Sequence, residues 1–178
     1  MIPIETAFFG LLLFFALVGA LRGWAKELLV TFSVILARFI ELVMLNYVPV
    51  LSQSLQTLQM SDPKTWLYVR MLLFVTIVVF GYATTMISAA LGQRARKEKL
   101  QDSLLGFFLG FINGFLIVGM IWGFLDTYGY NIWGITPPAP DNVVALGIIK
   151  WLPLHWLVGP TLFVSVALAF AFVLIVFI

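Results

Sequence analysis

Residues 103–125 read SLLGFFLGFINGFLIVGMIWGFL and contain no charged side chain. A helix needs about 20 apolar residues to cross roughly 30 Å of hydrocarbon, so this stretch is long enough to span a membrane. The rest of the chain has the same character, because 62% of its 178 residues are hydrophobic and 10% are charged. An ordinary soluble domain is about one quarter charged. The sequence therefore predicts an all-α integral membrane protein and not a soluble enzyme.

Apolar stretches on both sides of this segment set the number of spans. We expect spans at about residues 4–21, 27–47, 67–91, 103–125 and 160–178. The last stretch is only just long enough to cross, so the prediction is four to five transmembrane helices. The first stretch carries Glu5 and has no leading cation, and we therefore interpret it as a retained helix and not as a cleaved signal.

Two longer connections differ in composition from the spans. Residues 48–66 are polar and contain Asp62–Pro63, a turn or helix-start signal, so we expect a loop with one short surface helix. Residues 126–159 are rich in Gly, Pro and Trp, and Asp141 is the expected N-cap of a short interfacial helix at residues 142–152. The predicted organisation is a four-helix membrane domain at 1–125, an extracytoplasmic loop at 126–159 and a fifth transmembrane helix at 160–178.

Cations are distributed unevenly between the connections. The first and third connections hold Arg22, Lys26, Arg94, Arg96, Lys97 and Lys99, whereas the second and fourth hold Lys64 and Lys150. The positive-inside rule then places the first and third connections in the cytoplasm and the N-terminus outside. The run Arg94, Arg96, Lys97 and Lys99 is also a candidate for holding anionic lipid headgroups, although topology alone explains it.

Small residues are the expected packing signal, because helices in lipid associate through close backbone approach. Gly106, Gly110 and Gly114 recur every four residues, and Gly119 and Gly123 repeat the spacing. Another helix is therefore expected against this stripe. The candidate partners are Gly19 and Gly23 of the first span and Gly81, Ala89 and Ala90 of the third. Packing within one chain and homodimerisation both explain such a pattern.

Polar residues inside the spans are the candidate functional residues. Arg38 and Glu41 fall near the middle of the second span, where a charge is costly, and their spacing places them on one helical face as an ion pair. Counting the rise per residue from the span ends brings Tyr82 and Asn113 to a similar depth. We hypothesise a buried polar cluster of all four that relays protons, lines a substrate route or fixes helix register.

Signatures of catalysis and of cofactor binding are missing from the sequence. It contains no cysteine, a single histidine, no Gly-x-Ser-x-Gly elbow, no Walker loop and no dinucleotide-binding glycine motif. We therefore expect no enzyme activity, no catalytic residues, no metal and no cofactor. The net charge of +2 is explained by cations at span ends, so nucleic acid is not an expected partner.

Two motifs resemble the colicin V production protein family, CvpA, over roughly residues 1–125. Residues 19–28, GALRGWAKEL, are similar to its first hairpin, and residues 102–114 are similar to its glycine-rich last helix. Two differences are that family members often carry a basic residue where Asn113 stands, and that residues 126–178 are additional. The resemblance implies a bacterial inner-membrane protein linked to colicin V export and envelope homeostasis.

Three functions follow as expectations. The first is a non-enzymatic protein of the bacterial cytoplasmic membrane that supports export or envelope homeostasis, as the resemblance implies. The second is an accessory subunit of a larger respiratory or photosynthetic complex, suggested by 17 Phe, 6 Trp and the additional segment. The third is a small transporter or channel built around the polar cluster. The expected partners are membrane lipids and either other transmembrane proteins or further copies of this chain.

Overall fold

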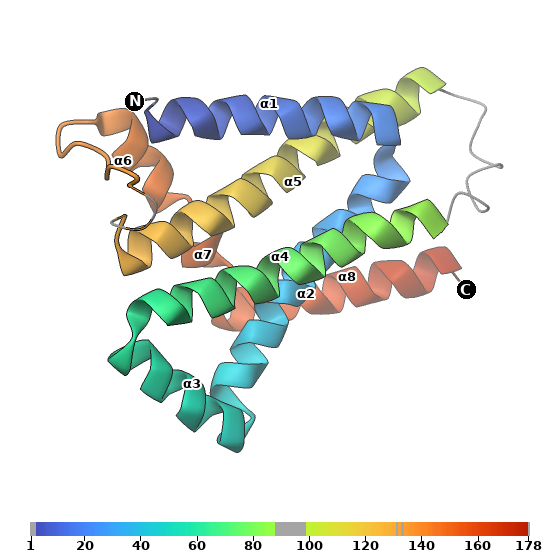
Figure 1. The fold of residues 1–178 in the computed structure, drawn as a ribbon. Coiled ribbons are helices and arrows are strands. Elements are labelled where there is room, and N and C mark those ends of the chain that lie inside the picture. Colours follow the sequence, from blue (N-terminus) through green and yellow to red (C-terminus); the bar gives the residue numbers. More distant parts are fainter. Residues whose placement is uncertain (1–2, 88–98, 131, 133, 178) are drawn as a thin grey trace.

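The computed structural model describes residues 3–87, 99–130, 132 and 134–177, and all the regular structure within them is helical. The helices are α1 (Ile4–Arg22), α2 (Trp24–Asn46), α3 (Pro49–Ser61), α4 (Pro63–Ile87), α5 (Lys99–Tyr128), α6 (Val143–Lys150), α7 (Pro153–Trp156) and α8 (Gly159–Phe177). In Figure 1, α1, α4, α5 and α8 extend between the two ends of the bundle, and α2 slants across behind α4.

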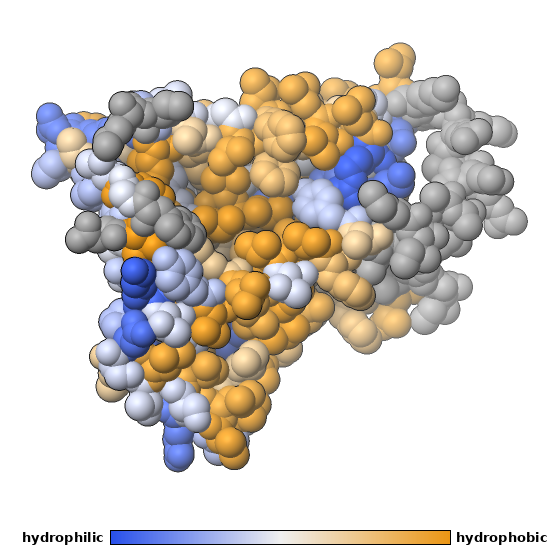
Figure 2. All heavy atoms as spheres, in the orientation of Figure 1, coloured by the Kyte–Doolittle hydropathy of each residue, from blue (hydrophilic) through white to orange (hydrophobic). Residues whose placement is uncertain are grey.

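Four helices, α1, α2, α4 and α5, are each long and apolar enough to cross a membrane. A fifth span is present if residues 143–156, which include α6 and α7, and helix α8 together form one membrane span with a 66° bend between them. Figure 2 shows hydrophobic side chains over the middle of the visible face and hydrophilic ones toward the helix ends. The prediction of an all-helical membrane protein with four to five spans is confirmed.

The α1–α2 turn packs against the start of α5. The turn between α1 and α2 is the single residue Gly23, whose φ of 86° favours glycine. The Asp102 carboxylate at the start of α5 accepts a hydrogen bond from the Trp24 backbone N–H at 3.1 Å. The Ser103 hydroxyl donates to the Ala20 carbonyl at 2.9 Å. The start of α5 therefore lies beside the α1–α2 turn (Figure 1), while the cytoplasmic side of the basic connections and the outside N-terminus stay predictions.

The glycine stripe of α5 packs directly against α1. A Cβ atom on Gly19 would lie 2.7 Å from the Cα of Gly110, and it would overlap the carbonyl oxygen of Gly106. A Cβ on Gly114 would lie 2.9 Å from the Cβ of Phe15. Real Cβ contacts are not this short, so the two backbones approach as closely as only glycine allows. The expectation that a helix lies against this stripe is confirmed, and the helix is α1 of the same chain.

The remaining glycines pack against other elements. A Cβ on Gly119 would lie 2.7 Å from the Cδ of Pro153, and one on Gly123 would lie 2.8 Å from the Cβ of Leu154. The stripe therefore also seats α7, a short segment that sequence spacing did not suggest. A Cβ on Gly81 would overlap the Ser33 side chain of α2, so this glycine packs against α2. The other candidates of the third span, Ala89 and Ala90, lie outside the described residues.

Replacing Gly110 with alanine is expected to lower the free energy of unfolding by about 1–3 kcal/mol, because the added methyl group meets the backbone of α1. Gly10 of α1 is the matched control, since a Cβ there has nothing within 4 Å. Thermal unfolding in detergent, followed by tryptophan fluorescence, measures both. Equal melting temperatures for the two variants would contradict the tight approach of α1 and α5.

The short helices have identifiable start signals. The Asp62 carboxylate accepts hydrogen bonds from the backbone N–H and the hydroxyl of Thr65. These bonds cap α4, which begins four residues earlier than expected, and they lower the pKa of Asp62. The surface helix α3 and the short helix α6 are both present, as predicted. The N-cap of α6 is Asn142 and not Asp141, because the Asn142 side chain accepts from the Ala145 N–H at 3.0 Å. Sequence could not separate these adjacent N-cap residues.

Candidate functional site

Helix α2 carries a buried stripe that organises the candidate site. The stripe is Glu27, Val30, Val34, Ala37 and Glu41, and each of these side chains is buried. Their alternating spacing of three and four residues keeps them on one face of the helix, which packs against α4 and α5. A carboxylate stands at each end of the stripe, and its members between them are apolar. Ser33, which is also buried on α2, donates to the Val30 carbonyl at 2.8 Å. Within the part of the chain that the structure describes, the buried charges are thus divided between two places.

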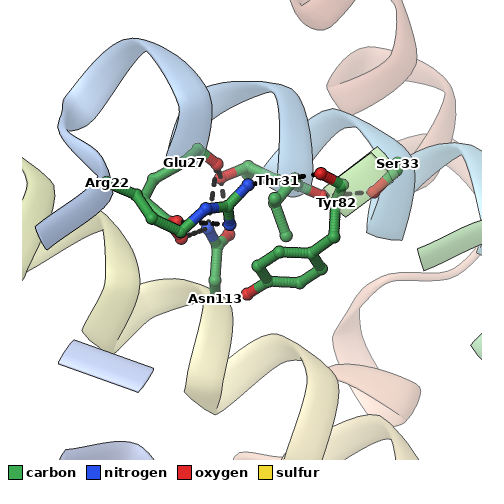
Figure 3. Close-up of polar contacts among 7 residues, drawn as sticks. Arg22, Glu27, Thr31, Ser33, Tyr82 and Asn113 are labelled. Atoms are coloured by element: carbon green, nitrogen blue, oxygen red, sulfur yellow. Dashed lines mark hydrogen bonds and ion pairs between the residues drawn. The ribbon is translucent and has the colours of Figure 1, made fainter. Parts of the chain in front are cut away.

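The first place is the turn cluster, formed by Arg22, Glu27, Thr31, Tyr82 and Asn113 (Figure 3). The Arg22 guanidinium lies 2.7 Å from the fully buried Glu27 carboxylate. The Asn113 amide donates to the other carboxylate oxygen of Glu27 and to its backbone carbonyl, each at 2.8 Å. The Thr31 hydroxyl lies 2.7 Å from the Asn113 carbonyl oxygen. Every carboxylate oxygen of Glu27 thus has a partner, as a buried charge requires.

Tyr82 of α4 closes one side of the turn cluster. The centre of the Arg22 guanidinium lies 4.3 Å from the centre of the Tyr82 ring, a distance typical of a cation–π contact. Arg22 also donates to the Tyr82 backbone carbonyl at 3.5 Å. The cluster consequently joins α4 and α5 to the residues on both sides of the α1–α2 turn. With one cation and one anion, its net charge is zero.

The second place is the arginine triad, formed by Arg38, Glu41 and Arg70. Arg38 and Arg70 bind different oxygens of the Glu41 carboxylate, and the Arg38–Glu41 distance is 2.6 Å. Relative exposures of the three side chains are 11%, 5% and 8%. Arg38 also donates to the Leu157 carbonyl, between α7 and α8, at 3.4 Å. The triad connects α2, α4 and the approach to α8, and it carries one excess positive charge.

Aromatic rings beside Arg70 offset part of that excess charge. The Arg70 guanidinium lies 4.2 Å from the centre of the Phe124 ring and 5.7 Å from that of Tyr128. The ring faces carry negative potential, so they attract a cation that has lost its water. The Tyr128 hydroxyl also accepts from the Trp66 indole N–H. These contacts fix α4 to the last turns of α5.

The structure divides the four predicted polar residues between these two places. Arg38 and Glu41 form the expected intrahelical ion pair, and Tyr82 and Asn113 belong to the turn cluster. The hypothesis of a single cluster was therefore wrong. The expected depths assume that α2 and α5 run parallel from equivalent ends, but α2 slants across the bundle and α5 begins at Lys99, before the expected start at residue 103 (Figure 1). Asn113 consequently lies level with Glu27 and not with Arg38.

Sequence reasoning missed three charged residues of the site. Arg70 is an isolated cation within an apolar run, which was a sufficient signal by the rule that intramembrane charges have partners. Arg22 and Glu27 were assigned to a surface turn and to a span start, because charges near span ends ordinarily face water. The period of the buried stripe, in which Glu27 and Glu41 occupy equivalent positions, would have identified Glu27.

Some predicted residues fall outside the part of the chain that the structure describes. The headgroup candidates Arg94, Arg96 and Lys97 lie there, and the Lys99 side chain is likewise not described. Among the described residues, no three side chains of His, Cys, Asp or Glu are grouped so that they could hold a metal ion.

The fold and its buried charges define a polytopic helical membrane protein whose helices are joined by glycine contacts and ion clusters. The family model for colicin V production protein matches residues 4–139. The match covers more than half of the chain, which therefore belongs to this family, and it extends past the boundary expected at residue 125. No curated protein and no solved structure matches the chain.

Proposed function

We propose that this chain is a non-enzymatic protein of the bacterial cytoplasmic membrane that supports colicin V export or envelope homeostasis as a rigid helical scaffold. Membership of the colicin V production protein family supports the link to colicin V. The proposal of a rigid scaffold rests on the turn cluster and the arginine triad. In each of them, charged side chains from different helices pair with one another inside the bundle. Such clusters resist rearrangement, because separating the partners leaves charges in a medium of low dielectric constant.

The apolar middle of the α2 stripe is the observation that favours a scaffold over a transporter. Glu27 and Glu41 are 14 positions apart, or about 21 Å along the helix axis at 1.5 Å per residue. Val30, Val34 and Ala37 are buried against neighbouring helices in this interval. The polar residues Thr31 and Ser33 lie in the half of the interval nearer Glu27. A proton or ion route needs polar side chains or water at successive positions, and on α2 the four apolar residues from Val34 to Ala37 interrupt the series of polar side chains.

Complementation in a colicin V producer that lacks its own family member tests the proposal. Expression of this chain should restore the zone of growth inhibition around the colony, and Gly110→Ala should restore less of it than Gly10→Ala. Failure to restore the zone, with the chain inserted in the membrane, would contradict the colicin V link. Proton flux in vesicles that Arg38→Met abolishes without loss of folding would instead support the transporter.

A subunit of a larger complex is the second candidate, and helix α8 favours it. This helix packs mainly against α2, and much of its apolar surface is exposed, including Val164, Leu168 and Phe170. Such a surface fits either lipid or another transmembrane chain. Native mass measurement after gentle extraction separates the candidates, since a subunit co-migrates with other chains and a scaffold appears as a monomer or homo-oligomer.

A further inference from the structure

A mainly apolar cavity of about 570 Å³ lies at the end of the bundle that holds the N-terminus. Its walls come from the first turns of α1, the last turns of α5 and the segment 134–142. Ile4, Phe8 and Val118 contribute to one side, and Ile135 and Pro137 contribute to the other. Pockets that take small molecules have volumes of about 300–1,000 Å³, so the cavity is large enough for a ligand.

Glu5 gives this cavity a polar end. One carboxylate oxygen of Glu5 accepts a hydrogen bond from the Asn142 amide at 2.8 Å. Asn142 is itself held in place, because its carbonyl oxygen caps α6. The second oxygen of Glu5 has no hydrogen-bond or ion-pair partner among the residues that the structure describes. A positioned carboxylate with a free oxygen thus stands at the edge of an apolar space.

The position of Glu5 along the helix fixes its depth. It lies in the first turn of α1, where the apolar span begins, and is therefore at the level of the lipid headgroups. Unlike Glu27 and Glu41, it is not paired with a described arginine or lysine. A negative charge here repels an anionic headgroup and attracts a protonated amine, and the adjoining cavity suits a hydrocarbon chain.

We propose that this cavity binds a phospholipid with a primary amine in its headgroup, of the phosphatidylethanolamine type. The ammonium group donates a charge-assisted hydrogen bond to the free oxygen of Glu5, and one acyl chain enters the apolar space between α1 and α5. The site goes beyond the proposed function, because it assigns the protein a preferred lipid whether or not it supports export. A lipid bound in this cavity would also contact both the segment 134–142 and helices α1 and α5 of the four-helix domain.

Lipid retention from a mixed bilayer tests the proposal. The full chain is reconstituted in nanodiscs of equal parts phosphatidylethanolamine and phosphatidylglycerol with identical acyl chains, transferred to detergent, and weighed by native mass spectrometry. Wild type should retain phosphatidylethanolamine preferentially. Glu5→Gln keeps the acceptor for Asn142 but removes the charge, and it should lower this preference about tenfold, the equivalent of one hydrogen bond to a charged group.

Two further variants separate the headgroup contact from other effects. Asp141→Asn removes an exposed charge beside Asn142 that does not line the cavity, and it should leave the preference unchanged. Ala7→Phe fills the cavity with Glu5 intact, and it should reduce the total lipid retained. Equal retention of both lipids by wild type, or equal losses in Glu5→Gln and Asp141→Asn, would overturn the proposal. Unchanged melting temperatures establish that each variant is folded.

Discussion

Replacement of Glu41 with glutamine is expected to lower the free energy of unfolding by about 3–5 kcal/mol, because it leaves Arg38 and Arg70 as buried cations without an anion. Glutamine has the same shape, so the loss is electrostatic and not a cavity effect. In the wild-type triad the carboxylate already serves two guanidiniums. No other carboxylate forms an ion pair with either arginine in the described part of the chain.

The double variant Glu41→Gln with Arg70→Met is the informative control for this prediction. Removing one cation relieves part of the unbalanced charge, and methionine retains an apolar side chain against the Phe124 ring. We expect the double variant to melt at a higher temperature than Glu41→Gln alone. Asp141→Asn, at an exposed site, should melt like wild type. If the single Glu41 variant also melts like wild type, the triad does not stabilise the bundle.

Replacement of Glu27 with leucine is the second change expected to cost about 3–5 kcal/mol in the free energy of unfolding. It removes the anion that pairs with Arg22 and the carboxylate that accepts from the Asn113 amide. Arg22 is 19% exposed and has some access to headgroups, so the cost should lie near the lower end of this range. Thermal unfolding monitored by tryptophan fluorescence measures it.

Asn113→Leu provides the companion measurement for the turn cluster. Glu27→Leu alone leaves the buried Asn113 amide without its carboxylate acceptor, whereas the double variant Glu27→Leu with Asn113→Leu removes the amide as well. The two losses should therefore add to more than the loss of the double variant, which is the signature of directly interacting residues. Strict additivity would show that Glu27 and Asn113 contribute independently, against the contact in Figure 3.

The fold was predictable because apolar length and glycine spacing are local signals. The run at 103–125 and the repeat of Gly106, Gly110 and Gly114 predict a span and a packing face without knowledge of any partner. The pair of Arg38 and Glu41 was predictable for the same reason, since both residues lie on one helix turn.

The membership of the polar clusters was not predictable, because it depends on how the helices cross. Asn113 meets Glu27 only because α2 slants across α5, and Arg70 reaches Glu41 from a different helix. Residue counts along separate spans contain no information about such angles. The cavity beside Glu5 depended in the same way on segment 134–142 returning to α1, a contact between residues distant in sequence.

The hydrogen bonds of Asp102 and Ser103 with the residues beside the α1–α2 turn affect the order in which the bundle assembles. The turn of the first hairpin is synthesised about 80 residues before Asp102 and Ser103, yet this turn and the glycine face of α1 are completed only by α5. During synthesis, α1 and α2 are therefore inserted in the bilayer before their contacts with α5 can form. Arrival of the late helix then converts an inserted chain into an assembled domain, so a truncation before residue 99 is expected to expose the early helices to quality-control proteases.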